Sequence, residues 1–218
     1  MLITQRVTPK PNDDGGVDVF GDSISAGTGT QHPYHELLMK TSGKEFLNYA
    51  IGSTGYVATT EDTVNAGNGG SGVAPVSKQS GNNTVLDQMK GISADEACII
   101  AAGTNDYGSN VSQSDFRNAV RETLDYALTK FDKSKILVIA PIKRKGFDNA
   151  NSQGLKLADY DKIIEDEATK SGITCVDGYQ VPLDPVVNKE DYCDDGLHLN
   201  DAGHKVLADY LAAYVKGI

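Results

Sequence analysis

Short apolar runs recur along the chain, and each is followed by a polar or glycine-rich turn and then by a helical repeat of apolar residues. This alternation is typical of a parallel β-sheet whose strands are joined by crossover helices. Two of the runs, 97–102 and 135–140, are continuously apolar, as expected for strands covered on both faces. The predicted strands are 17–20, 45–50, 97–102, 135–140 and 173–177.

Two long helices are predicted from apolar residues that repeat every three or four positions. The first begins near Ser112 and continues to Phe131. The second begins after Asn200 and Asp201, two residue types that commonly cap helices. Weaker patterns predict three more helices, at 33–41, 84–90 and 155–170.

The length of 218 residues suits one domain, so we expect an N-terminal extension over 1–16 and a single catalytic domain over 17–218. Twenty basic against thirty acidic residues give a net charge of −10, which disfavours nucleic acid and anionic lipid as partners. The sequence contains no apolar stretch long enough to span a membrane. We therefore expect a soluble protein, cytoplasmic, or exported or phage-borne if a signal segment precedes the given sequence.

Two polar connections interrupt the regular alternation. Residues 53–83 are rich in glycine, serine, asparagine and threonine, and such a long connection inside a compact domain is either disordered or functional. Residues 143–153 form a second polar segment after the fourth predicted strand. In a parallel sheet, the loops that follow the strands gather at one edge, where open α/β folds bind their ligands.

Residues with catalytic potential follow several of these strands. Ser23 follows the first strand, Asn105 follows the third, and Asp195 and His198 lie three residues apart before the last helix. A serine hydroxyl becomes a good nucleophile when a neutral imidazole takes its proton and a carboxylate orients that imidazole. Ser23, His198 and Asp195 fit these three roles.

Attack on an acyl carbon also places negative charge on an oxygen atom, which must meet preorganised hydrogen-bond donors. The candidate donors are the backbone N–H of Ser23, a backbone N–H at Gly52 or Ser53, and the side-chain amide of Asn105. The sequence thus supplies both a nucleophile system and a candidate oxyanion hole.

Four short stretches, in this order, resemble the four blocks of the SGNH, or GDSL-type, serine hydrolases. They are "GDS" at 21–23, "NYAIGSTG" at 48–55, "GTND" at 103–106 and "DGLH" at 195–198. The resemblance implies a three-layer α/β/α sandwich with a flavodoxin-like parallel sheet of about five strands. It also implies a Ser-His-Asp esterase mechanism without a metal or cofactor, and an oxyanion hole from serine, glycine and asparagine.

The second block departs from the family pattern. The family usually has glycine five residues after the asparagine of this block, a position that is Ser53 here, with glycines at Gly52 and Gly55. Because the donor is a backbone N–H, a serine can supply it.

Each block also has a structural interpretation as a turn or a helix cap. Asp201 and His204 repeat the three-residue spacing of Asp and His, but we expect them inside the last helix, as a cap and a surface residue. Asp194 beside Asp195 permits a metal site with His198, although adjacent carboxylates do not easily face one ion. Asp195 and His198 remain the preferred pair.

Three classes of function fit these residues. The first is a serine esterase that removes a short acyl group such as acetyl, on a carbohydrate or another small molecule, because the chain has no tryptophan and few phenylalanines. A long-chain acyl thioesterase or lysophospholipase could use the same residues. A flavodoxin-type electron carrier would bind FMN phosphate at the hydroxyl-rich loop "SISAGTGT", and a carbohydrate-binding module could reuse an esterase scaffold.

Overall fold

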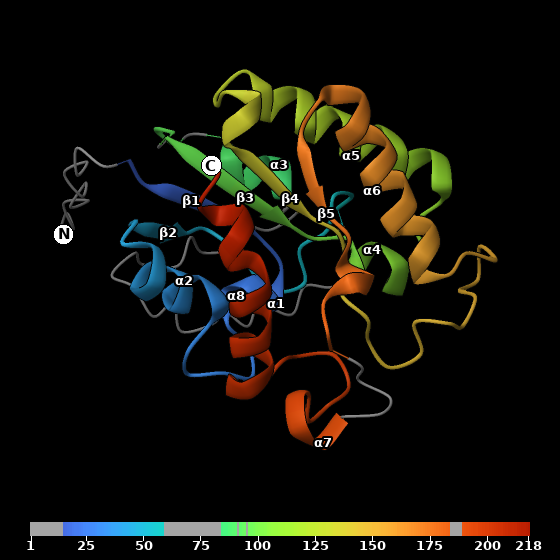
Figure 1. The fold of residues 1–218 in the computed structure, drawn as a ribbon. Helices are drawn as coiled ribbons and strands as arrows, with labels where there is room; N and C mark the ends of the chain where they lie inside the picture. The colour runs from blue at the N-terminus through green and yellow to red at the C-terminus, as the bar shows by residue number, and fades with distance from the viewer. Residues whose placement is uncertain (1–14, 59–83, 91, 95, 184–188) are drawn as a thin grey trace, which may run out of the picture.

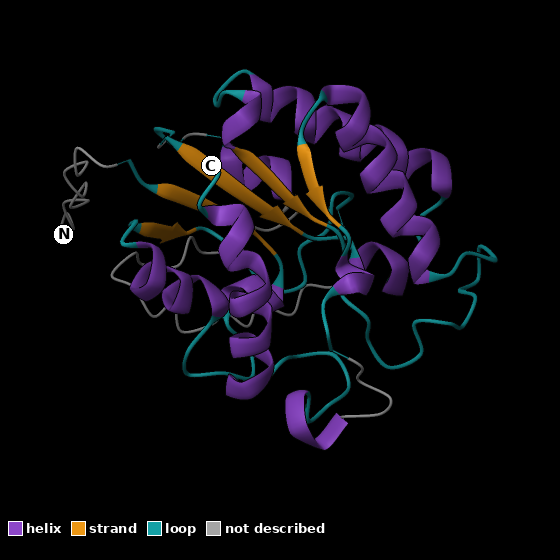
Figure 2. Ribbon diagram, in the orientation of Figure 1, coloured by secondary structure: helices purple, strands orange, loops and turns teal. Residues whose placement is uncertain are grey.

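The computed structural model describes residues 15–58, 84–90, 92–94, 96–183 and 189–218. Its centre is a five-stranded parallel sheet with the strand order β2-β1-β3-β4-β5 (Figure 2). All five predicted strands are confirmed. Their bounds are β1 Val17–Gly21, β2 Phe46–Asn48, β3 Ala97–Ala101, β4 Ile136–Ile139 and β5 Thr174–Val176.

Helices cover both faces of the sheet (Figure 1). The helices α3, α5 and α6 lie on one face, and α2 and α8 lie on the other. The fold is therefore a three-layer α/β/α sandwich. The helices are α1 Ser23–Ala26, α2 Tyr34–Ser42, α3 Val85–Met89, α4 Thr104–Gly108, α5 Gln113–Leu128, α6 Leu157–Ser171, α7 Lys189–Tyr192 and α8 Asp201–Val215, with 3-10 turns at Lys133–Lys135 and Gly178–Gln180.

All five predicted helices are present, within a few residues of their expected ends. The Ser112 side chain caps α5 by accepting a hydrogen bond from the Asp115 N–H. Phe116, Val120 and Leu124 then place one apolar stripe of α5 in the core. No helix of the described residues is long and apolar enough to cross a membrane.

The three central strands are buried almost completely, which explains the continuously apolar sequences of β3 and β4. β1 and β3 lie side by side, with Val17 opposite Ala97 and Gly21 opposite Ala101. From β1 the chain continues to β2 on one side, whereas from β3 it continues to β4 on the other. The loops after β1 and β3 therefore diverge, and this point of a flavodoxin-like sheet is where a ligand crevice forms.

Two segments named in the sequence analysis are only partly described. Residues 1–14 of the expected N-terminal extension lie outside the described residues, and so do residues 59–83 of the long connection 53–83. The second polar connection, 143–153, is described throughout. It lies beside the candidate active site, where the Lys145 N–H bonds to the Gly196 carbonyl.

Candidate active site

Ser23 lies where β1 ends and the short helix α1 begins. Asp22 caps this helix, because its carboxylate accepts a hydrogen bond of 2.9 Å from the Ile24 N–H. The turn needs glycine at position 21, since a Cβ there would lie 2.4 Å from the Ala101 carbonyl oxygen. The chain thus leaves β1 against the end of β3 and places Ser23 at the carboxyl edge of the sheet.

Gln88 of α3 fixes the backbone directly before this turn. Its side chain accepts a hydrogen bond from the Gly21 N–H and donates one to the Gly21 carbonyl, both at 2.8 Å and both buried. No role for Gln88 was predicted from the sequence. The two residues are 67 positions apart, and a lone glutamine in a predicted helix carries no signal of such a contact.

A row of three polar side chains runs from Ser23 toward the surface. The His198 Nε2 lies 2.9 Å from the Ser23 Oγ, and the His198 Nδ1 lies 2.6 Å from an Asp195 carboxylate oxygen. The other Asp195 oxygen accepts hydrogen bonds from the N–H groups of Leu197 and His198. The structure therefore brings the three predicted residues into one hydrogen-bonded row.

Charge and hydrogen bonding favour an ionised Asp195. Its partial burial acts to raise the pKa, but hydrogen bonds from the His198 N–H, the His198 ring and the Leu197 N–H outweigh burial and lower it. With a carboxylate accepting from the His198 Nδ1–H, the Nε2 is left as an acceptor for the Ser23 hydroxyl.

The loop that carries His198 is tied to the loop between α1 and α2. Asn200 is the cap of α8, with its side chain accepting from the Gly203 N–H. Asp201, which was expected to cap α8, instead accepts hydrogen bonds from the Thr30 hydroxyl and the Gln31 N–H. These contacts connect the segment after Ser23 with the segment after His198.

The Asn105 amide lies close to the turn that carries the second candidate oxyanion donor. The Asn105 side-chain amide donates a hydrogen bond of 2.8 Å to the Thr54 carbonyl, which joins α4 to the turn that contains Gly52 and Ser53. An amide nitrogen has two N–H groups, so this contact leaves one for a ligand. Ser53 has a φ of 60°, in the left-handed region that glycine prefers, which matches the glycine that the family pattern usually places there.

The Asp106 side chain fixes the backbone that directly follows this turn. Its buried carboxylate accepts hydrogen bonds from the N–H groups of Tyr56 and Val57, at 3.0 and 2.9 Å. Gly55 is required beside it, because a Cβ there would lie 2.6 Å from an Asp106 oxygen. Burial raises the pKa of Asp106 to about 7, and the two backbone hydrogen bonds oppose that rise.

His204 is not a surface residue, and this expectation was wrong. Its side chain is fully buried between α8 and α2, where it stacks on the Tyr34 ring and accepts a hydrogen bond from the Tyr34 N–H. The periodicity of a helix indicates which face is apolar, but it does not reveal that a histidine is included in that face. The second Asp-His spacing is therefore part of the core.

Acid should destabilise the fold through His35 and His204, which are both fully buried. Burial lowers the pKa of His35 from 6.5 to about 4 and that of His204 to about 3. As the pH falls below 6.5 the unfolded chain therefore binds protons that the folded chain excludes, and stability is lost down to the folded-state values. For His35 alone the loss amounts to about 3 kcal/mol at most.

Urea unfolding of the unmodified protein and of His35→Leu at about pH 7 and about pH 5 isolates the part of this loss that is due to His35. Two proteins must be compared because burial raises the pKa of Asp22 to about 6 and that of Asp106 to about 7, so these carboxyls stabilise the folded state as the pH falls. His35→Leu, which is similar in size and removes the titrating group, should make stability less dependent on pH over this interval. An unchanged pH dependence in His35→Leu would show that this histidine does not contribute.

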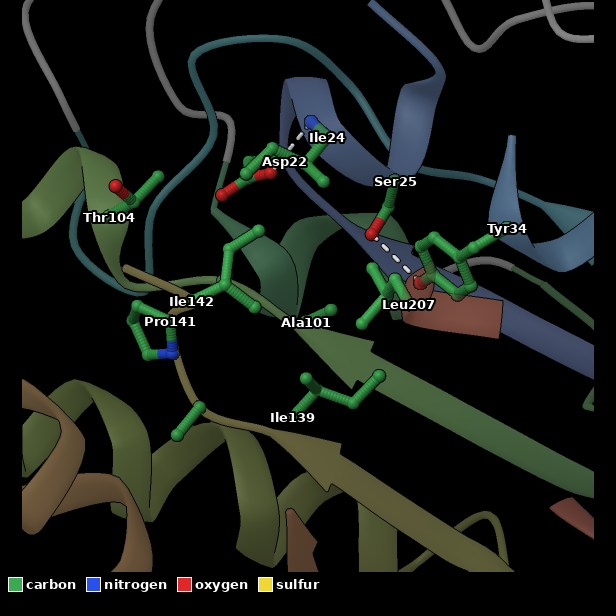
Figure 3. Close-up of a pocket in the computed structure, with 12 residues that line it drawn as sticks. Asp22, Ile24, Ser25, Tyr34, Ala101, Thr104, Ile139, Pro141, Ile142 and Leu207 are labelled. Atoms are coloured by element: carbon green, nitrogen blue, oxygen red, sulfur yellow. Dashed lines mark hydrogen bonds between the residues drawn. The ribbon is translucent and has the colours of Figure 1, made fainter. Parts of the chain in front are cut away.

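A small pocket lies beside the turn that presents Ser23 (Figure 3). Its volume is about 30 Å³, which is room for about two water-sized groups. The polar groups in its wall include Asp22 and the hydrogen-bonded pair of Ser25 and Tyr34. The other lining residues are Ile24, Ala101, Ala102, Thr104, Ile139, Ala140, Pro141, Ile142 and Leu207.

These groups form an arrangement suited to acyl transfer. A hydroxyl, an imidazole and a carboxylate lie in a row, and the Asn105 amide is held against the turn that contains Gly52 and Ser53. Such a set can activate an oxygen nucleophile and stabilise the charge that develops on a carbonyl oxygen.

Comparisons with known structures agree with this fold. A protein from Lactobacillus plantarum is 20% identical and has a TM-score of 0.73, covering 92% of this chain and 95% of its own. An acetyl xylan esterase is 19% identical (TM-score 0.64; 92% and 99% covered), and a carbohydrate acetylesterase from Sinorhizobium meliloti is 15% identical (TM-score 0.62; 92% and 97% covered). No curated protein sequence matches the chain.

The sequence profile of the GDSL-like Lipase/Acylhydrolase family matches residues 19–206, which is most of the chain and includes all four blocks. The chain therefore belongs to the GDSL-like lipase/acylhydrolase family of carboxylic ester hydrolases.

Proposed function

We propose that the protein hydrolyses short acyl esters through Ser23 as nucleophile, His198 as general base and Asp195 as the group that orients His198. The observation that carries this proposal is the row of contacts from Ser23 through His198 to Asp195, at 2.9 and 2.6 Å. The catalytic unit is the single domain 17–218, because its first strand presents Ser23 and its last helix follows His198.

The reaction takes place in two steps. The Ser23 Oγ attacks the acyl carbon while its proton moves to the His198 Nε2. His198 then gives this proton to the departing alcohol oxygen, the bond from the acyl carbon to that oxygen breaks, and an acyl-serine remains. In the second step a water molecule attacks the acyl carbon while His198 takes a proton from it. His198 then gives this proton to the Ser23 Oγ, the bond from the acyl carbon to Oγ breaks, and the acid is released.

The oxyanion of each tetrahedral intermediate binds to preorganised donors. These are the backbone N–H of Ser23, a backbone N–H of the Gly52–Ser53 turn and the amide of Asn105. Asn105 is held by Thr54, so its amide does not have to reorganise as the charge develops. Gln88 and Asp106 act as positioning residues, because they hold the backbone before Ser23 and the turn beside Asn105.

A short acyl group, such as acetyl on a carbohydrate, suits the site best. The pocket beside Asp22 holds about two water-sized groups, which fits an acetyl methyl group but not a long acyl chain. Two structurally similar proteins are an acetyl xylan esterase and a carbohydrate acetylesterase, and both are under 20% identical to this chain. They support the proposal without assigning a substrate.

A series of p-nitrophenyl esters of increasing acyl length tests the substrate size. We expect kcat/KM to be highest for acetate or propionate and to fall steadily with longer chains, because added methylenes exceed the pocket. A maximum at long chains would contradict the short-acyl assignment and favour a thioesterase or lysophospholipase.

The flavin-binding electron carrier is no longer favoured. Family membership indicates a hydrolase, and residues of the loop after β1 already contact the segment that contains His198 and Asp201. Ser23 of this loop contacts His198, and Thr30 contacts Asp201.

A further inference from the structure

The chain contains one contiguous run of basic residues, Lys143, Arg144 and Lys145, directly after β4. Every other lysine and arginine is separated from the next by at least one residue, and the net charge is −10. Most ion pairs of the described residues lie on helices, and none of them involves this run. Three positive charges that form no ion pair within the described part of the chain are thus concentrated on one loop, and Arg144 acts on a carboxylate only at longer range, by lowering the pKa of the buried Asp22.

This run borders the candidate active site on two sides. The Lys145 N–H donates a hydrogen bond of 2.7 Å to the carbonyl of Gly196, which lies between Asp195 and His198 in the sequence. Arg144 Nη1 lies 3.2 and 3.3 Å from the hydroxyl and carbonyl oxygens of Thr104, the residue before Asn105. The run therefore joins the acid-base loop to the helix of the oxyanion donor.

The Arg144 side chain is held in place but only partly satisfied. Its guanidinium lies over the Tyr107 ring, 5.8 Å from the ring centre. Its Nε is buried and has no hydrogen-bond partner among the residues that the structure describes. A buried donor on a charged group is costly when unpaired, so an anion that reaches this guanidinium would supply a missing hydrogen-bond partner.

We infer that Arg144 binds a carboxylate of the ester substrate and that Lys145 adds to the local positive potential. The enzyme then selects esters whose acyl or alcohol part carries one negative charge close to the scissile bond. A planar guanidinium is well suited to bind a substrate carboxylate, because it can donate two parallel hydrogen bonds to it. This inference rests on the proposed ester hydrolysis at Ser23.

Two matched pairs of esters test the inference. For the alcohol part, 4-acetoxybenzoate is compared with neutral 4-acetoxybenzamide. For the acyl part, p-nitrophenyl hydrogen succinate is compared with p-nitrophenyl methyl succinate. The quantity is the ratio of kcat/KM for the charged ester to that for the neutral ester, each relative to its hydroxide-catalysed rate. Spontaneous hydrolysis is subtracted first, because the free carboxylate of the hydrogen succinate attacks its own ester and releases p-nitrophenolate without the enzyme.

We expect this ratio to exceed about ten in at least one pair and to fall as salt is added. Arg144→Gln should bring the ratio close to one. Lys143→Gln removes an equal charge from the neighbouring residue, whose ammonium lies over the Tyr179 ring, and should keep most of the preference. Because both rates come from one preparation, a loss of folded protein cancels in the ratio.

A ratio near one in the unmodified protein would overturn the inference, and so would a ratio that Arg144→Gln leaves unchanged. If the neutral esters are still hydrolysed when either of these results is found, the proposed ester hydrolysis at Ser23 stands and only the role of Arg144 is contradicted. Absence of hydrolysis for all four esters would instead contradict the proposed function, and the inference with it.

Discussion

Ser23→Ala should lower kcat for ester hydrolysis by about four orders of magnitude or more. The substitution removes the oxygen that forms the acyl-enzyme, and nothing else in the proposed mechanism replaces it. KM should change little, because the substrate contacts do not depend on the Ser23 hydroxyl. Steady-state hydrolysis of p-nitrophenyl acetate, after subtraction of the uncatalysed rate, measures the loss.

Folding provides the control for this variant. The turn at Ser23 is held by Gly21, Asp22 and Gln88, none of which bonds to the Ser23 hydroxyl. Ser23→Ala should therefore unfold at nearly the same urea concentration as the unmodified protein. Residual kcat within tenfold of the original would indicate a different nucleophile.

His198→Ala should produce a loss of similar size, about four orders of magnitude, because Ser23 then lacks its general base. The two losses should not add in the double variant, since either substitution alone disables the same step. Steady-state kinetics of the two single variants and the double variant measure this directly.

His204 provides the matched comparison. Its ring stacks on Tyr34 inside the core and makes no contact with Ser23 among the described hydrogen bonds. His204→Ala should lower the free energy of unfolding, because it leaves a cavity, but should change kcat per folded molecule only a few-fold. A loss in kcat at His204 as large as that at His198 would reverse the assignment.

The strands and long helices were predictable because burial on both faces or along one stripe leaves a clear apolar pattern. The short helices α1 and α4 were not predicted, although both contain site residues. Each has only four or five residues and, unlike α3, no pair of apolar residues three or four positions apart. The blocks "GDS" and "GTND" in these helices were recognised from their residue types and from their order along the chain, and not from a helical period.

The site was predictable where its chemistry requires particular residue types. Ser23, His198 and Asp195 were named from their roles, and the structure places them in one row. The contacts of Gln88, Asp106 and Arg144 depend on tertiary pairing over 40 to 67 positions, which a single sequence does not display. The burial of His204 was missed for the same reason.

The central claim is that Ser23 is the activated nucleophile of an ester hydrolase. A fluorophosphonate probe bonds covalently to a serine that an imidazole activates, and mass spectrometry of the digested protein identifies the labelled residue. We predict a single label on the peptide that contains Ser23, formed at the rate at which activity is lost, and no label in Ser23→Ala or His198→Ala. Labelling at another serine, or full ester hydrolysis by a protein that remains unlabelled at Ser23, would contradict this account.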